Sequence, residues 1–171
     1  TLNLNQALST NKIVVTASAD NSPPVNIKEA SLSSDVDKNI PETAITKANT
    51  YALIIGNEDY SSFQMGLSKE VNADYALNDA RIFKEYCNKT LGVPERQIKL
   101  LSNATAGQMN QGIAWLANLA KVDNGKAELI VYYSGHGLPD EQTKEPYLIP
   151  VDVSGSNVTQ GIRLNDVYTK L

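Results

Sequence analysis

Aromatic residues and glycines occupy only one part of this chain, and their distribution constrains where a folded core can form. The eight tyrosines, two phenylalanines, one tryptophan and ten glycines all lie at or after Tyr51. Residues 1–50 carry three of the seven prolines and, from Ser18 onward, mostly Ser, Asn, Asp, Lys and Thr. Because a core requires large apolar side chains, we expect a packed domain at 51–171 and a linker or wrapping arm at 21–50.

The first twenty residues show a different pattern, in which apolar residues alternate with polar ones. Those on one face are Leu2, Leu4, Ile13, Val15 and Ala17. With a turn at 9–11, this spacing predicts a β-hairpin over residues 1–20. The hairpin resembles the end of a bacterial immunoglobulin-like repeat, and the alternative is an edge hairpin that packs on the main domain. Because the sequence opens with neither Met nor a signal peptide, we expect residue 1 to lie inside a longer gene product.

Within 51–171, short apolar segments alternate with longer helical patterns. Three segments have the length and composition of buried strands: 51–56, 98–101 and 128–133. Apolar residues recur at helical spacings, mostly every three or four positions, in two stretches between them, 73–91 and 109–120. A short extended segment and a further helix follow, at 147–151 and 164–171. This order predicts an α/β domain with a mostly parallel sheet and helices on its faces.

Charge and cysteine content exclude several classes of protein. The formal net charge is −4, the wrong sign for a surface that neutralises several phosphates, so no nucleic acid partner is expected. No apolar run approaches the roughly 20 residues of a membrane-spanning helix. With one cysteine and one histidine, the sequence supports neither an internal disulfide nor a zinc site built from four Cys and His ligands.

The single histidine lies in the segment most informative about chemistry. Residues 132–137 read Tyr-Tyr-Ser-Gly-His-Gly, which places His136 directly after an apolar strand. Open α/β sheets hold their sites at the carboxyl ends of strands, and imidazole exchanges protons near neutral pH. The flanking glycines allow a sharp bend and bring backbone N–H groups close to a bound group. His136 is therefore a candidate general acid–base, and the alternative is a histidine that only caps the strand.

Four segments together resemble the caspase-like cysteine peptidases (peptidase family C14, clan CD), most closely their bacterial and metacaspase branch. They are the histidine motif, Tyr51–Asn57, Asn78-Asp79-Ala80 and Tyr147–Asp152, in the family's order over 51–171. The resemblance implies a three-layer α/β/α sandwich that is incomplete at its C-terminus. It also implies a cysteine nucleophile, His136 as base, the Gly137 N–H as an oxyanion donor and no cofactor.

The expected nucleophile is not among these residues. In caspases the cysteine follows the histidine by roughly 50 residues, and this sequence extends only to Leu171. We therefore expect the cysteine on a C-terminal part of the same enzyme, which would be this chain's partner, and expect this chain alone to be inactive. Cys87 precedes His136 and lies on an apolar helix face, which is typical of a structural thiol.

Within the metacaspase branch, the resemblance implies an acidic primary pocket that takes Lys or Arg. Asp79 and Ser134 occupy the matching positions, so the expected substrates are peptides or proteins with a basic residue before the cleaved bond. Asp79 also fits an acid at a helix N-terminus, and the two roles are compatible. Asp152 and Asp166 are weak calcium candidates, because two carboxylates fall short of the ligands that calcium needs.

A second class of function remains open, a non-catalytic caspase-like scaffold or binding module. The presence of His136 with Asp79 favours the peptidase, since a binding scaffold needs neither an imidazole nor a pocket acid. An immunoglobulin-like module beside a peptidase would suit an exported or cell-envelope protein, and this weakly favours that location over the cytoplasm.

Overall fold

The computed structural model describes residues 35–122 and 126–171. The chain divides into two units, Thr1–Leu32 and Ser33–Leu171, and the described residues belong to the second. The hairpin predicted at 1–20 lies outside the described residues. Among those that are described, no helix has both the length and the apolar character that crossing a membrane requires.

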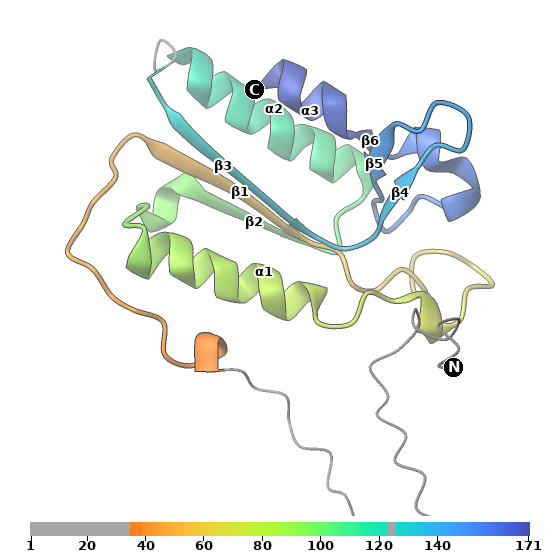
Figure 1. Cartoon of the computed structure of the whole chain (residues 1–171), viewed down its shortest axis with the longest axis horizontal. Helices are drawn as coiled ribbons and strands as arrows, with labels where there is room; N and C mark the ends of the chain where they lie inside the picture. Colours follow the sequence, from red (N-terminus) through yellow and green to blue (C-terminus); the bar gives the residue numbers. More distant parts are fainter. Residues whose placement is uncertain (1–34, 123–125) are drawn as a thin grey trace, which may run out of the picture. The chain divides into compact units, whose positions relative to one another are not determined.

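A three-stranded parallel sheet forms the centre of the domain (Figure 1). Its strands are β1 (Thr50–Gly56), β2 (Ile98–Ser102) and β3 (Glu128–Ser134), in the order β2-β1-β3. These are the three apolar segments of the sequence, each matched to within one residue at either end. Gly56 lies opposite both Ser102 and Ser134, so the three carboxyl ends are level.

Helices cover both faces of this sheet. In Figure 1, α1 (Ala76–Glu85) lies below the sheet, and α2 (Ala106–Val122) with α3 (Leu164–Lys170) lies above it. The chain leaves β1 toward β2 and then crosses back to β3 on the far side of β1. Because such crossovers are right-handed, the two connections place their helices on opposite faces. The predicted α/β sandwich, with a parallel sheet between helical layers, is confirmed.

The side chains of the central strand β1 are buried on both faces of the sheet. Its side chains alternate, so Leu53 and Ile55 pack against α2 and α3, whereas Ala52 and Ile54 pack against α1. All four are at most 1% exposed. A strand covered on both faces carries a continuous apolar run rather than an alternating one, as this one does.

The first helix is shorter than the apolar stripe that predicted it. It begins at Ala76 because Tyr75 has a left-handed backbone, and from Tyr86 to Thr90 it loosens into a π-helical turn. Cys87 lies in this turn and is fully buried against the sheet. Burial raises the pKa of its thiol to about 11, so the thiolate is scarce at neutral pH.

A second, smaller sheet follows the histidine motif. It is antiparallel and consists of β4 (Gly137–Pro139), β5 (Pro146–Leu148) and β6 (Ile162–Arg163). A third apolar cluster forms beside it, from Tyr60, Tyr147, Ile149, Val151 and Val153. The sequence predicts only an extended segment here, and no residue pattern indicates β4 or β6. This sheet holds the backbone that immediately follows His136.

Residues before β1 run along the far end of α1. Thr43 N–H donates to Lys89 O and Lys47 N–H donates to Gly92 O, at 3.0 and 2.8 Å. A Cβ at Gly92 would lie 2.1 Å from the carbonyl oxygen of Ile45, and its φ is +74°. Only glycine fits this close approach, which ties the segment before the sheet to the end of the first helix.

Candidate active site

The carboxyl ends of β1 and β3 meet at the point where the chain reverses its direction across the sheet. The connection after β1 goes to one side, and β3 is reached on the other, so the loops after these two strands diverge and leave a crevice. Asn57 follows β1 and Gly135 follows β3 at this position. The predicted base, His136, therefore lies where an open α/β sheet forms its site.

The imidazole of His136 is fixed by a backbone carbonyl. Its Nε2 lies 2.6 Å from the carbonyl oxygen of Val71, at the end of a short 3-10 helix, Lys69–Val71. A carbonyl only accepts hydrogen bonds, so Nε2 must carry the proton, and in the neutral ring Nδ1 holds the free lone pair. No hydrogen bond to Nδ1 is present among the described residues. Nδ1 is thus the ring atom available to accept a proton.

Two tyrosine hydroxyls hold the backbone of the histidine. The N–H of His136 donates to Tyr60 Oη at 2.9 Å, and Tyr133 Oη lies 2.8 Å from the His136 carbonyl oxygen. Both hydroxyls also reach the carbonyl oxygen of Ile149, at 3.0 and 2.9 Å. Burial raises the pKa of both tyrosines, so they remain neutral donors across the physiological range. The Tyr60 ring also contacts the imidazole, with 4.6 Å between ring centres.

Below these hydroxyls, Asn57 braces the loops that form the crevice. Its side chain is fully buried and accepts from the N–H of Ala104 at 2.7 Å. Its amide donates to the carbonyl oxygens of Ala104 and Ile149, at 3.2 and 3.4 Å. The Asn57 side chain therefore connects the segments that follow β1, β2 and β5, and these segments support the loop that carries His136.

Gly135 is required by the close packing of this loop. Its φ is +154°, and a Cβ at this position would lie 2.7 Å from Tyr133 Oη, 2.9 Å from Tyr60 Oη and 3.0 Å from Asn57 O. All three contacts are tighter than real Cβ atoms ordinarily show, and two of the atoms are the hydroxyls that hold His136. A residue with a side chain at position 135 would therefore collide with the two tyrosine hydroxyls, so this position requires glycine.

We expect Gly135→Ala to lower the free energy of unfolding by about 3 kcal/mol, because it adds both overpacking and backbone strain. Urea denaturation of this chain measures the change. Gly107→Ala is the matched control, since Gly107 is exposed in the first turn of α2 and its added Cβ would meet nothing closer than 3.9 Å. The control should be neutral or slightly stabilising, and equal effects of the two variants would contradict the packing argument.

Asp79 and Ser134, both predicted to line a substrate pocket, are in contact. Ser134 Oγ donates to Asp79 Oδ2 at 3.2 Å. Asp79 is exposed in the first turn of α1, and Ser134 ends β3 on the face that packs against this helix. The charge of Asp79 reaches the neighbouring strand, since burial and this carboxylate together raise the pKa of Tyr132. Asp79 and Ser134 thus form an acidic pair, of which Ser134 lies two residues before His136 in the sequence.

The N–H of Gly137 is directed away from the small sheet. Gly137 pairs with Leu148 in the antiparallel ladder, and Ile149 N–H donates to His136 O. This bond makes Gly137 and Leu148 a non-hydrogen-bonded pair, in which neither N–H points at the partner strand. Gly137 is exposed at this edge. Its N–H is thus available to a group bound beside His136.

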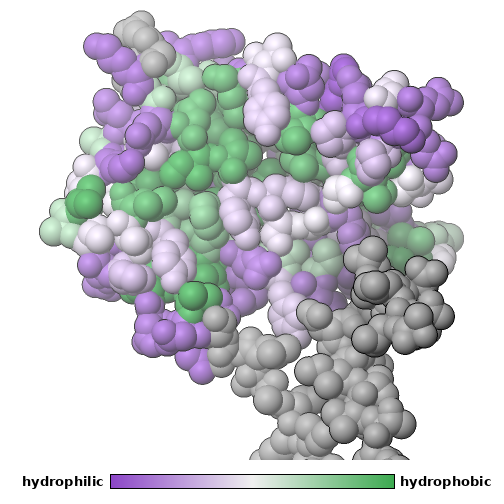
Figure 2. Space-filling view, viewed as in Figure 1, coloured by the Kyte–Doolittle hydropathy of each residue, from purple (hydrophilic) through white to green (hydrophobic). Residues whose placement is uncertain are grey.

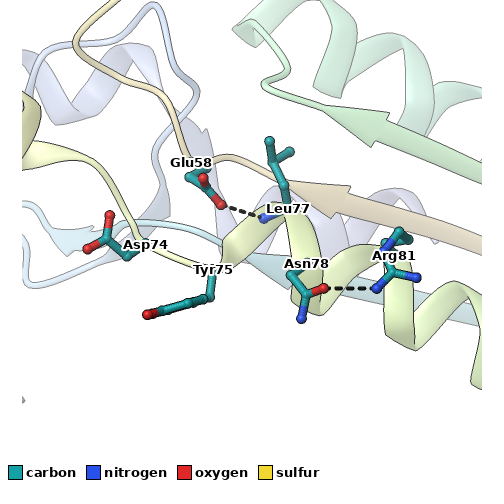
Figure 3. A pocket seen from close by; sticks show the side chains of 6 residues that line it. All are labelled: Glu58, Asp74, Tyr75, Leu77, Asn78 and Arg81. Carbon is teal, nitrogen blue, oxygen red and sulfur yellow. Dashed lines mark hydrogen bonds between the residues drawn. The ribbon is translucent and has the colours of Figure 1, made fainter. Parts of the chain in front are cut away.

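Two cavities adjoin this region. The larger, about 550 Å³, lies at the start of α1 and contains neither His136 nor Asp79 (Figure 3). Its polar groups are partly paired with one another, because Glu58 accepts from Leu77 N–H at 3.1 Å and Arg81 donates to Asn78 at 2.9 Å. The second cavity, about 370 Å³, has His136 in its wall and is otherwise largely apolar.

The two calcium candidates have other partners in the structure. Asp152 accepts from the N–H of Ala106 at 2.8 Å and so caps the start of α2. Asp166 lies 3.9 Å from the guanidinium of Arg163. Among residues 35–122 and 126–171, no three His, Cys, Asp or Glu side chains gather as metal ligands. This arrangement does not fit a calcium site, so calcium dependence stays a prediction and no catalytic step is assigned to the ion.

Sequence reasoning missed the groups that hold His136. Val71 contributes a backbone carbonyl, which no residue pattern marks, and Tyr60 lies in an irregular polar stretch. Tyr133 belongs to an apolar strand, and its position in that strand predicts only a place in the core. The sequence does contain one signal for these contacts, the two tyrosines directly before Ser-Gly-His-Gly. A buried tyrosine hydroxyl requires a hydrogen-bond partner, and the nearby histidine loop can supply one.

These features define a doubly wound α/β domain with an oriented histidine base and a neighbouring carboxylate at its switch point. A family model for the caspase domain matches residues 49–171. The chain therefore belongs to the caspase domain family, peptidase family C14, and it carries a domain of the cysteine peptidase type, whose substrates are proteins or peptides. No match to a curated protein was found.

Proposed function

We propose that this chain is the histidine-bearing part of a cysteine endopeptidase that cleaves after Lys or Arg. The observation that carries the proposal is the Asp79–Ser134 hydrogen bond beside a histidine whose Nδ1 is free to accept a proton. A carboxylate at this place favours a guanidinium or ammonium group in the substrate. The histidine supplies the acid–base group that cleavage of the adjacent bond requires.

The open edge of β3 supports a nucleophile on a further strand. Within the described part of the chain, no strand pairs with β3 on the side away from β1. Val131 of this strand is 39% exposed, and Figure 2 shows apolar surface where β3 crosses the middle of the face. A parallel strand added here would end level with Ser134 and next to His136. We place the cysteine at the end of such a strand, on a C-terminal part of the enzyme.

In the proposed reaction, Nδ1 of His136 takes the proton of the thiol, and the thiolate attacks the carbonyl carbon of the scissile peptide. The N–H of Gly137 stabilises the oxyanion that forms. The imidazolium then gives its proton to the leaving amine, which departs as the peptide C–N bond breaks. Water hydrolyses the resulting thioester, with His136 as the base that accepts the water proton. The Val71 carbonyl holds the Nε2 proton, so Nδ1 is the atom that takes up and returns a proton in each step.

A peptide panel tests this function on the chain together with its C-terminal continuation. Fluorogenic peptides that differ only in Arg, Lys or Asp before the reporter should be cleaved with kcat/KM at least about 100-fold higher for Arg and Lys than for Asp, because only the basic side chains pair with Asp79. Preference for Asp would overturn the acidic pocket. Absence of cleavage, together with no labelling by an Arg-based thiol-reactive probe, would favour the binding scaffold instead.

A further inference from the structure

The cavity beside His136 has apolar walls from three separate segments. Leu67 and Val71 come from the loop after β1, Leu138 from β4, and Ile149 and Val153 from the segment after β5. Its volume, about 370 Å³, is at the lower end of the range for ligand pockets, so it suits one side chain rather than a long ligand.

Most of the polar groups in this cavity are already engaged. Tyr60 Oη is bonded to the backbone of Ile149 and His136, and Gln64 Nε2 donates to the carbonyl oxygens of Val151 and Val153, at 2.8 and 3.0 Å. Ser154 Oγ is bonded to Ser156. A polar side chain would therefore lose its hydration and gain few new partners.

Two apolar side chains of the cavity remain partly in solvent. Leu67 is 40% exposed and Leu138 is 37% exposed. An apolar group in the cavity would remove part of this surface from water, which is favourable. The occupant that the cavity favours is thus apolar and about the size of one side chain.

The cavity and the acidic pair are built from different residues around His136. Ser134 faces α1, where Asp79 is located, together with the side chains of Ile130 and Tyr132. The cavity is formed with Ile149 and Val153, whose cluster extends to Ala106 at the start of α2 and to Ala73 before α1. None of the residues that line the cavity belongs to the acidic pair.

We propose that this cavity binds an apolar side chain of the residue immediately after the cleaved bond. The inference rests on the proposed function. If the basic residue before the bond lies against Asp79, the leaving amine must lie within reach of His136, which protonates it. The next side chain then enters the cavity that has His136 in its wall.

Binding of a leaving-group analogue to this chain tests the cavity without catalysis. Leucine amide and serine amide differ only in the side chain, and His136 is the only histidine, so its ring signals in NMR spectra report on the site unambiguously. We expect leucine amide to shift these signals saturably, with a Kd at least about tenfold lower than that of serine amide. Equal affinities would overturn the inference.

A pair of matched variants assigns the binding to the cavity. Leu138→Ser removes one apolar wall and should weaken leucine amide binding about tenfold, whereas Leu91→Ser should leave it unchanged. Leu91 is 38% exposed, like Leu138, but lies at the end of the π-helical turn and not in the cavity. Thermal unfolding of both variants checks that each is folded. Unchanged binding to folded Leu138→Ser would contradict the proposed pocket.

Cleavage by the chain with its C-terminal continuation separates this inference from the proposed function. Quenched peptides with Arg before the bond and Leu, Phe, Ser or Asp after it should differ at least about tenfold in kcat/KM, in favour of Leu and Phe. An Arg–coumarin reporter, which has no amino acid after the bond, is the reference. Cleavage of the reporter with a flat peptide series would overturn the pocket alone. Selective amide binding without any cleavage would overturn the peptidase and leave the pocket in place.

Discussion

Replacing His136 with Ala is expected to lower kcat/KM on Arg peptides by about three orders of magnitude in the chain with its C-terminal continuation. The imidazole both removes the thiol proton and returns a proton to the leaving amine, and general acid–base catalysis contributes factors of about 10² to 10⁴. Single-turnover kinetics should show the loss in formation of the acyl-enzyme, because the thiol proton is transferred before that step.

The tautomer gives this prediction a second, independent measurement. With Nε2 bonded to the carbonyl of Val71, the neutral ring should show a protonated Nε2 and an unprotonated Nδ1 in ¹⁵N NMR spectra of this chain. Tyr60→Phe is the control for a purely structural effect. It removes a hydrogen bond to the His136 backbone but leaves the imidazole of His136 unchanged. Full activity of His136→Ala, or a ring protonated on Nδ1, would contradict the assigned role.

The layers of the fold were predictable because each depends on a local pattern. Strand β1 is covered on both faces, so its apolar run is continuous over 51–56 and is recognised without knowledge of its neighbours. The helical stripe that includes Ala80 and Cys87 has the spacing of one buried face. The exact start of α1 was not predictable, because it depends on a left-handed backbone at Tyr75, which is uncommon for a residue other than glycine and which no residue pattern marks.

The small sheet was not predictable, because its strands do not depend on a local residue pattern. Its strands β4, β5 and β6 have two or three residues each, and two of them include a proline. A segment this short has no measurable period, and proline weighs against strand assignment. These strands form because Tyr147 and Ile162 become buried when the segment folds back on the domain, which is a non-local event.

In the candidate site, too, some residues are marked by a local sequence pattern and others are not. His136 is recognisable because it combines an unusual residue with glycines at a strand end, whereas Asp79 and Ser134 are marked only by resemblance to the family. Their hydrogen bond joins two segments that are 55 residues apart in sequence. The supports of the histidine, Val71 above all, act through backbone atoms and therefore leave no trace in residue type.

Asp79→Ala is expected to reduce kcat/KM on Arg and Lys peptides by about two orders of magnitude and to leave little preference over uncharged residues. The variant removes the carboxylate that pairs with the basic side chain, and charge-assisted hydrogen bonds are about twice as strong as neutral ones. Because Asp79 is exposed, the fold should tolerate the change, with the midpoint of thermal unfolding lowered by only a few degrees.

Two further variants separate charge from hydrogen bonding at this pair. Asp79→Asn retains the size of the side chain and an oxygen that accepts from Ser134, so a loss close to that of Asp79→Ala would assign the effect to charge. Ser134→Ala removes only the donor to Asp79 and should cost less than tenfold, since the carboxylate remains. The double variant should then lose less than the product of the two single effects, because the residues act as a unit. Retained preference for Arg and Lys in Asp79→Ala would show that another group binds the basic side chain.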